Sequence, residues 1–230
     1  MDAPPRDKAR FLSQYPEGEY RPYGSLVAAW QEITRWIGVR VGGRERVLEI
    51  AAGPCVFINN FPAREKHAVD LWEGVRRHAA KDVRVQIRSC TDLGCYPDDS
   101  FDLVMAGHVL EHLTIEDALR CIAEVRRVLA TGGLFVIVQP NFKYAYRSFY
   151  DDWTHRTPFT ERGLAKILTL NGLQPTTIMA RFFIGSGRKS QLTWLPPLVY
   201  RLYLSLPIRP FATQMLIIAE KKEKITYDDR

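Results

Sequence analysis

The residues best suited to bind a ligand follow four short apolar segments of this 230-residue sequence. Small residues among them let the backbone approach a ligand closely, and Gly53 can adopt a positive φ angle. Carboxylate side chains such as Asp70 can accept hydrogen bonds from hydroxyl or amino groups. In chain order, the candidate ligand-binding residues are Glu49, Ala51, Gly53, Asp70, Leu71, Asp92, Leu93 and His108.

The order of these residues indicates the kind of ligand. Asp70 follows Gly53 at close to the ~20 residues that separate a glycine turn from a ribose-binding acid. The loop at Gly53 lacks a G-x-G-x-x-G motif, which argues against a dinucleotide with a pyrophosphate group. Asp92 can accept a hydrogen bond from an adenine amino group. A nucleoside that carries a cation instead of phosphates fits this row of acids, and S-adenosylmethionine is such a ligand.

A second set of polar residues follows the fifth apolar segment. Histidine titrates near neutral pH and can accept a hydroxyl proton, so we predict that His155 is a general base. Asp151, or its neighbour Asp152, can orient the imidazole ring. The alternative is that His155 makes a purely structural hydrogen bond. For Glu111 and His112 we favour packing and the edge of the ligand site over catalysis, and we expect no metal site.

Short apolar segments bounded by turn residues predict the strands that must position these side chains. We expect strands at residues 46–51, 66–71, 83–87, 100–105, 134–138, 176–183 and 215–219, and helices from Ser25, over 114–129 and over 161–170 with Thr160 as N-cap. Apolar strands that alternate with helices predict a mostly parallel α/β sheet covered on both faces. Ligands bind such sheets beyond the carboxyl ends of the strands, where we expect the candidate residues to meet.

Several phrases of the sequence are similar to those of a known family. They are Val47-Leu48-Glu49-Ile50, Ala68-Val69-Asp70-Leu71, Cys90-Thr91-Asp92-Leu93, His108-Val109-Leu110-Glu111-His112-Leu113 and Arg127-Val128-Leu129-Ala130-Thr131-Gly132-Gly133. Over residues 45–140 the chain resembles the class I S-adenosylmethionine-dependent methyltransferases. The resemblance implies a Rossmann-like, seven-stranded sheet that is mostly parallel with an antiparallel last strand and has helices on both faces. It also implies S-adenosyl-L-methionine as cofactor, bound by the residues named above.

A narrower resemblance covers most of the remaining chain. The segments Phe57-Ile58-Asn59-Asn60, Gln139-Pro140-Asn141, Tyr150-Asp151, His155 with Pro158, and Leu202-Tyr203-Leu204 are similar to a bacterial subgroup often associated with glycan assembly. One departure concerns the first motif, where the family has three alternating glycines. Ala51 and Cys55 stand at the outer two positions, and only Gly53 remains. A non-catalytic relative that binds a nucleoside without turnover is therefore an alternative.

Composition excludes several classes of protein. Hydrophobic residues make up 46% and charged residues 25%, as in globular domains. No stretch reaches the ~20 apolar residues of a membrane-spanning helix, and the N-terminus does not resemble a secretory signal. Four scattered cysteines argue against zinc ligation and a disulfide framework, and they favour a reducing, cytoplasmic location. The net charge of +6 is spread along the chain, so we expect no nucleic-acid binding.

The chain is expected to contain one main domain with additions. We expect an N-terminal arm and helix over residues 1–44 that can cover the site, a methyltransferase domain over 45–220 and a polar tail over 221–230. An apolar insertion at about 186–212 interrupts this domain. Its residues 192–208 can line the acceptor pocket, form a homodimer contact or rest on a membrane surface.

These observations together predict a metal-independent O-methyltransferase. The methyl acceptor is expected to be a small molecule or glycan, methylated on a hydroxyl of a sugar, glycan or secondary metabolite. An N- or C-methyltransferase acting on a natural product is the alternative within enzymes, and it needs no strong base. The alternative outside enzymes is the non-catalytic binding module.

Overall fold

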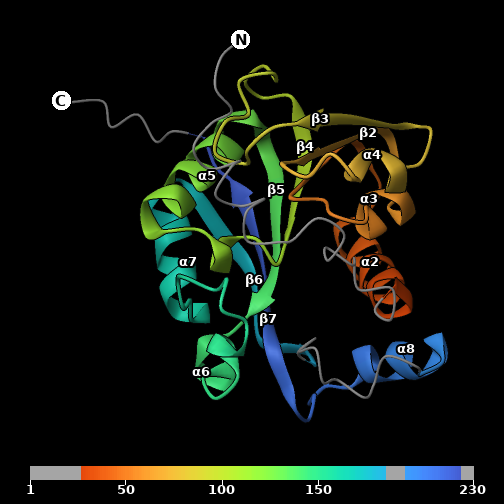
Figure 1. Cartoon of the computed structure of the whole chain (residues 1–230), viewed down its shortest axis with the longest axis vertical. Coiled ribbons are helices and arrows are strands. Elements are labelled where there is room, and N and C mark those ends of the chain that lie inside the picture. Colours follow the sequence, from red (N-terminus) through yellow and green to blue (C-terminus); the bar gives the residue numbers. More distant parts are fainter. Residues whose placement is uncertain (1–26, 185–194, 224–230) are drawn as a thin grey trace.

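The chain forms a seven-stranded sheet (Figure 1), whose order is β3-β2-β1-β4-β5-β7-β6. The strands are β1 (Arg44–Ile50), β2 (Ala63–Asp70), β3 (Val83–Ile87), β4 (Phe101–Gly107), β5 (Leu129–Pro140), β6 (Leu173–Ile184) and β7 (Ala212–Lys221). The structure is a computed structural model, and it describes residues 27–184 and 195–223.

Strand directions follow the expected Rossmann-like pattern. β1 pairs in parallel with β2 and β4, and the β2–β3 and β4–β5 pairs are also parallel. β7 is antiparallel to both of its neighbours, β5 and β6. The prediction of a mostly parallel sheet with an antiparallel last strand is therefore confirmed. The strand order reverses between β1 and β4, so the topological switch point lies at the carboxyl ends of these two strands.

Helices cover both faces of this sheet (Figure 1). They are α2 (Val27–Val41), α3 (Val56–Asn60), α4 (Val75–His78), α5 (Ile115–Val128), α6 (Phe142–Ala145), α7 (Glu161–Leu170) and α8 (Pro197–Ser205), with 3-10 turns η2 (Leu110–His112) and η3 (Phe149–Asp151). α5 and α7 lie on one face, whereas α2, α3 and α8 lie on the other.

Alternate residues of each central strand join one of two buried cores. In β1, Leu48 and Ile50 pack in the core beneath α5 and α7, whereas Val47 packs in the core beneath α2 and α3. The strands therefore read as continuous apolar runs, because both of their faces are covered. Glu49 is the exception in β1, since it is a buried acid on the α3 side of the sheet.

The helix N-termini have the caps that their sequences favour. Thr160 accepts a hydrogen bond from the N–H of Gly163, as predicted, and Thr114 accepts one from Asp117 at the start of α5. The end of α5 differs from the prediction, because β5 begins directly at Leu129 rather than at the expected residue 134. A Cβ atom on Gly133 would lie 2.7 Å from the Ala130 carbonyl oxygen, so this glycine is required by close strand packing.

The first residue of the predicted polar tail, Lys221, is also the last residue of β7. Lys221 is buried, and its Nζ donates to Asp99 Oδ1 and to the Leu129 carbonyl oxygen, both at 2.6 Å. These bonds attach the last residue of β7 to the start of β5. The predicted N-terminal cover, the cap at Ser25, the first part of the predicted insertion and the end of the tail lie outside the described residues.

α8 belongs to the predicted apolar insertion and packs against α2. Tyr200 and Leu204 are buried there, and Arg201 forms an ion pair with Glu32 of α2 at 3.0 Å. The opposite side of α8 leaves apolar side chains such as Leu202 exposed. Among the described residues, no helix has the length and apolar character needed to cross a membrane. Contact of this segment with a membrane surface or with a second copy remains a prediction.

Candidate functional site

Asp70 joins the loops that follow β1 and β2. Its Oδ2 accepts a hydrogen bond from the N–H of Gly53, and its Oδ1 accepts one from the N–H of Trp72, both at 2.7 Å. The N–H of Leu71 also bonds to this carboxylate. Two oxygens offer about four acceptor positions, so the carboxylate can still accept hydrogen bonds from a ligand. The structure thus brings Gly53, Asp70 and Leu71 together at the switch point.

The loop after β1 keeps a left-handed backbone at all three positions where the resembled family has glycine. The φ angles are 50° at Ala51, 48° at Gly53 and 57° at Cys55. A non-glycine residue in this region costs roughly 1–2 kcal/mol, which surrounding contacts must offset. Cys55 is fully buried, and its Sγ lies 3.9 Å from the carbonyl oxygens of Gly53 and Val75. The core beneath α2 and α3 therefore accommodates the cysteine side chain.

Two buried acids meet at this loop. Glu49 accepts a hydrogen bond from the N–H of Ile58 in α3 at 3.0 Å. Burial raises the pKa of Glu49 to about 8, and the nearby Asp70 contributes to this shift. Burial also raises the pKa of Asp70. Within the described part of the chain, neither acid has an ion-pair partner, so a cationic ligand would favour their ionised forms.

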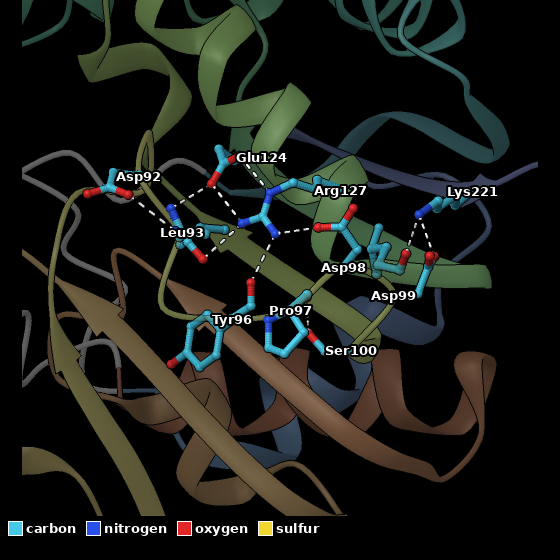
Figure 2. A network of polar contacts seen from close by, with 12 residues as sticks. Asp92, Leu93, Tyr96, Pro97, Asp98, Asp99, Ser100, Glu124, Arg127 and Lys221 are labelled. Carbon is cyan, nitrogen blue, oxygen red and sulfur yellow. Dashed lines mark hydrogen bonds and ion pairs between the residues drawn. The ribbon is translucent and has the colours of Figure 1, made fainter.

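Arg127 of α5 holds the loop that follows β3 (Figure 2). Its Nη1 donates to the Tyr96 carbonyl oxygen and its Nη2 to the Leu93 carbonyl oxygen, each at 2.9 Å. Its Nε donates to Glu124 at 2.9 Å, and Oε2 of Glu124 accepts the N–H of Leu93 at 2.7 Å. The planar guanidinium thus fixes the backbone that carries Asp92 and Leu93.

The two predicted residues of this loop have different surroundings. The Leu93 side chain is fully buried in the core beneath α5. The Asp92 side chain is 63% exposed, and it bonds to Arg88 Nη1 at 2.9 Å and to the N–H of Gly94 at 3.2 Å. In the described structure, the Asp92 carboxylate makes no hydrogen bond to the residues at the β1 and β2 loops. The role of Asp92 and Leu93 in binding an adenine ring stays a prediction.

His108 lies at the carboxyl end of β4, beside the switch point. Its φ angle is 53°, and its N–H donates to the Val138 carbonyl oxygen at 2.9 Å. Its Nδ1 lies 3.0 Å from Oε1 of Glu111, and its ring packs edge-on against Trp30 of α2. A Cβ atom on Gly107 would lie 2.9 Å from the Trp30 ring, so glycine permits this close approach of α2.

The segment after β5 folds against η2 and brings His155 beside it. The N–H of Arg156 donates to the Glu111 carbonyl oxygen at 2.7 Å. His155 Nδ1 donates to the Phe149 carbonyl oxygen at 2.6 Å, because a carbonyl can only accept. Asp151 is exposed and makes no described contact with His155. The Phe149 backbone therefore orients this ring in the structure, and a role for Asp151 stays a prediction.

His112 is oriented by a chain of two hydrogen bonds. The Thr154 hydroxyl donates to Asp152 Oδ1 at 2.6 Å, so towards His112 Nδ1, at 2.9 Å, it must accept. His112 consequently carries its proton on Nδ1. Burial lowers the pKa of His112, which favours the neutral ring. Its centroid lies 4.8 Å from that of His155.

Comparisons with known proteins agree with this geometry. Residues 48–137 match the family described as "Methyltransferase domain". A search of curated proteins finds no match. A SAM-dependent methyltransferase from Archaeoglobus fulgidus has 24% identity and a TM-score of 0.64, covering 92% of this chain and 99% of that chain.

Two further solved structures are similar to this chain and contain S-adenosylhomocysteine. The 1,6-didemethyltoxoflavin-N1-methyltransferase of Burkholderia thailandensis has 19% identity and a TM-score of 0.61, covering 97% of this chain and 94% of that chain. The N-methyltransferase NodS of Bradyrhizobium japonicum has 14% identity and a TM-score of 0.60, covering 84% of this chain and 86% of that chain. At these identities the structures establish the fold.

Residues 48–137 match a methyltransferase domain, and the order of the strands fits the Rossmann-like fold of the similar methyltransferase structures. The predicted methyl donor is S-adenosylmethionine, whose product S-adenosylhomocysteine is bound in two of the similar structures. The switch-point residues fit this donor, because Glu49 and Asp70 are buried acids without a cationic partner among the described residues. Asp70 also retains acceptor positions that suit ribose hydroxyls. Ala51 and Cys55 both adopt left-handed backbone angles in this loop, as Gly53 does.

Sequence reasoning did not predict that His155 would lie beside Glu111 and His112. One carboxylate oxygen of Glu111 and one ring nitrogen each of His112 and His155 lie within 4.8 Å of one another. The adjacent Glu111-His112 pair was visible in the sequence, but the approach of His155 was not. Sequence reasoning also did not single out Gln139, near the end of β5. Its side-chain amide is buried and has no hydrogen-bond partner in the described structure.

Proposed function

We propose that this methyltransferase acts on a hydroxyl group of a sugar, glycan or secondary metabolite. The observation that carries the proposal is the fixed tautomer of His155. Because Nδ1 donates to the Phe149 carbonyl oxygen, the neutral ring has a lone pair on Nε2 that can accept a proton. A hydroxyl acceptor must lose its proton during methylation, whereas an amine acceptor needs no strong base.

The chain's residues divide this task between two places. At the switch point, Asp70 would bind the ribose of S-adenosylmethionine and Glu49 would face its cationic part, with Asp92 and Leu93 towards the adenine. The donor supplies an electrophilic methyl group. The protein must then align the acceptor and exclude water, which gives most of the rate. Nε2 of His155 takes the hydroxyl proton and releases it to solvent afterwards.

A methyl-transfer assay with defined acceptors tests this proposal. Monosaccharides, nucleotide sugars and phenols form the hydroxyl panel, and amines of similar size form the nitrogen panel. His155→Ala is expected to lower kcat by about 10²–10⁴-fold on hydroxyl acceptors, with binding of S-adenosylhomocysteine unchanged. His78→Ala is the matched control, since His78 lies on α4 and is separate from this segment.

The second candidate acceptor is a nitrogen atom. Two of the similar structures are named as N-methyltransferases, which favours testing this class. On a nitrogen acceptor, His155→Ala would retain most of the rate because no strong base is needed. Transfer to amines alone, with this pattern in the variant, would replace the hydroxyl proposal.

The exposed side of α8 supports a peripheral role for this segment. Leu198, Leu202, Ile208 and Phe211 are exposed apolar side chains on α8 and the residues after it. We propose that this side contacts a membrane surface, where a lipid-linked acceptor would be found. Leu202→Glu is expected to abolish flotation with liposomes. A wild-type chain that stays with the soluble fraction contradicts this proposal, and a concentration-dependent dimer would assign the surface to a second copy.

A further inference from the structure

Three side chains that can each offer one ligand atom to a metal ion converge beside the loop that follows β4. A carboxylate oxygen of Glu111 and one ring nitrogen each of His112 and His155 lie within 4.8 Å of one another. Glu111 is 0% exposed, and its Oε2 has no hydrogen-bond partner in the described structure. A buried carboxylate oxygen without a partner is costly, so this arrangement calls for a cation or a shared proton.

In the described part of the chain, both histidines hydrogen-bond through Nδ1, which leaves Nε2 for a ligand. His155 donates from Nδ1 to the Phe149 carbonyl oxygen at 2.6 Å. His112 donates from Nδ1 to Thr154, whose hydroxyl in turn donates to Asp152. A histidine that binds a metal ion through one nitrogen usually donates its other N–H to a carbonyl or carboxylate, which fixes the ring. His155 has a carbonyl partner of this kind, and His112 reaches the Asp152 carboxylate through the Thr154 hydroxyl.

Glu111 is held in place as well. Its Oε1 is 3.0 Å from Nδ1 of His108, and its backbone carbonyl oxygen accepts the N–H of Arg156 at 2.7 Å. The first bond anchors the carboxylate and the second attaches the His155 segment to the same residue. The three groups therefore come from two segments that are hydrogen-bonded to each other.

We propose that Glu111, His112 and His155 bind one first-row divalent transition-metal ion. Two imidazole nitrogens and one carboxylate are the donor set of zinc and iron sites, whereas Mg²⁺ prefers six oxygens. Bonds of ~2.0–2.1 Å in a tetrahedral site place ligand atoms roughly 3.3 Å apart, which requires only a small closing movement of these side chains. Three protein ligands leave a coordination position open for water or an acceptor.

The metal site itself does not depend on the proposed reaction, whereas the role of the ion rests on it. A bound ion is a Lewis acid that lowers the pKa of a coordinated hydroxyl. Nε2 of His155 cannot bind an ion and accept a proton at once. With the ion present, His155 is therefore a ligand, and the acceptor proton leaves to solvent.

The experiment is a metal titration of the full chain after removal of bound ions with a chelator. Calorimetry with Zn²⁺ is expected to give about one ion per chain, and Co²⁺ is expected to give the visible absorption of a nitrogen- and oxygen-ligated ion. Mg²⁺ is expected to compete with neither ion. If both Zn²⁺ and Co²⁺ bind more weakly than a Kd of about 100 µM, the proposal is overturned. A proton shared among the three side chains would then take the place of the metal ion.

Variants assign the site to these residues. His155→Ala is expected to weaken Zn²⁺ binding more than about 100-fold, and Thr154→Val, which only removes the partner of His112, by about 10-fold. His78→Ala controls for adventitious binding to a histidine outside the cluster and is expected to change nothing. If neither His155→Ala nor Thr154→Val changes the Zn²⁺ affinity, the proposal is overturned. Because two variants are measured, the test still holds when one of them folds less well.

Activity separates this proposal from the proposed function. If the chain binds an ion at these residues and methylates no hydroxyl, the metal site stands and the O-methylation proposal fails. If hydroxyl methylation proceeds at full rate in chelator and is lost in His155→Ala, the O-methylation proposal stands. In that case His155 acts as the base, and the metal site is overturned as a functional centre.

Discussion

At the scale of single residues, Asp70 shows how one carboxylate serves both the fold and the ligand. Its two oxygens accept the N–H groups of Gly53 and Trp72, which fixes the loops after β1 and β2. Its remaining acceptor positions are those that a ribose would need. A substitution at this residue therefore affects stability and affinity together, and the two effects must be measured separately.

We predict that Asp70→Asn weakens binding of S-adenosylhomocysteine by at least about 10-fold. The amide replaces one acceptor by a donor and removes a charge-assisted hydrogen bond worth about 1.5–3 kcal/mol. Asp102→Asn is the matched control, because Asp102 Oδ2 also accepts a backbone N–H, from Arg46 at 2.8 Å, at the opposite end of the sheet. Calorimetry should show reduced affinity only for Asp70→Asn. Equal affinities in the two variants would remove Asp70 from the binding site.

Glu49 leads to a prediction about pH. Burial raises its pKa to about 8 in the folded chain, against 4.5 for the ordinary side chain. Between these values the folded state binds a proton that the unfolded state has lost, so the free energy of unfolding falls as pH rises, by up to about 1.4 kcal/mol per pH unit. Glu49→Gln does not titrate and is expected to remove this loss.

Urea denaturation at pH 5 through 8 measures the effect. The free energy of unfolding of Glu49→Gln, relative to that of the wild type, is expected to increase across this range by more than about 1 kcal/mol. Glu45→Gln removes an exposed carboxylate from the same strand and serves as the control. A constant difference between Glu49→Gln and the wild type would show that Glu49 is ionised in the folded chain throughout.

At the scale of elements, α5 positions the loop after β3 through side chains rather than through apolar packing alone. The Arg127 guanidinium donates to the carbonyl oxygens of Leu93 and Tyr96, and to Asp98 at 2.8 Å (Figure 2). The same loop carries Asp92, one of the predicted ligand residues. A helix on one face of the sheet thus determines the shape of a binding loop at the sheet's edge.

We predict that Arg127→Met lowers the free energy of unfolding by about 1–3 kcal/mol, because two backbone carbonyls lose their donor. It should also speed amide hydrogen exchange over residues 88–100 more than elsewhere. Arg120→Met is the control, since Arg120 lies on the same helix with a side chain that is 71% exposed. Uniform acceleration of exchange across the sheet would indicate general destabilisation instead of a loosened loop.

At the scale of the whole molecule, the accuracy of sequence reasoning depended on the length and periodicity of each element. The expected strand at 83–87 and helix at 161–170 coincide with β3 and α7, because their apolar patterns are regular and their ends have turn or cap residues. α3 was not predicted, since its five residues, Val56–Asn60, are too few to show a helical period.

One part of the candidate site could be predicted from the sequence, and another part could not. The switch-point residues Gly53 and Asp70 could be predicted, because parallel topology places consecutive strand ends at one edge. The Glu111, His112 and His155 cluster could not, because it forms only when the segment after β5 folds back onto η2. That path depends on backbone hydrogen bonds and loop packing, which leave no periodic signal in the sequence.

The loops after β1, β2, β3 and β4 come from separate parts of the chain, yet one nucleoside would contact all of them. A ligand that binds only the folded arrangement should therefore stabilise the entire sheet. At 100 times its Kd, S-adenosylhomocysteine is expected to add about 2.7 kcal/mol, which raises the melting temperature by roughly 5–10 °C for a chain of this size.

Adenosine tests which part of that ligand matters. It keeps the ribose that Asp70 would bind but lacks the amino-acid portion, whose ammonium group the buried acid Glu49 should attract, so at equal concentration we expect a smaller rise in melting temperature. Equal rises with both compounds would mean that Glu49 contributes nothing to recognition of the ammonium group. A melting temperature unchanged by millimolar S-adenosylhomocysteine would contradict the assignment of the switch point as the donor site, because binding to the folded chain alone must raise it.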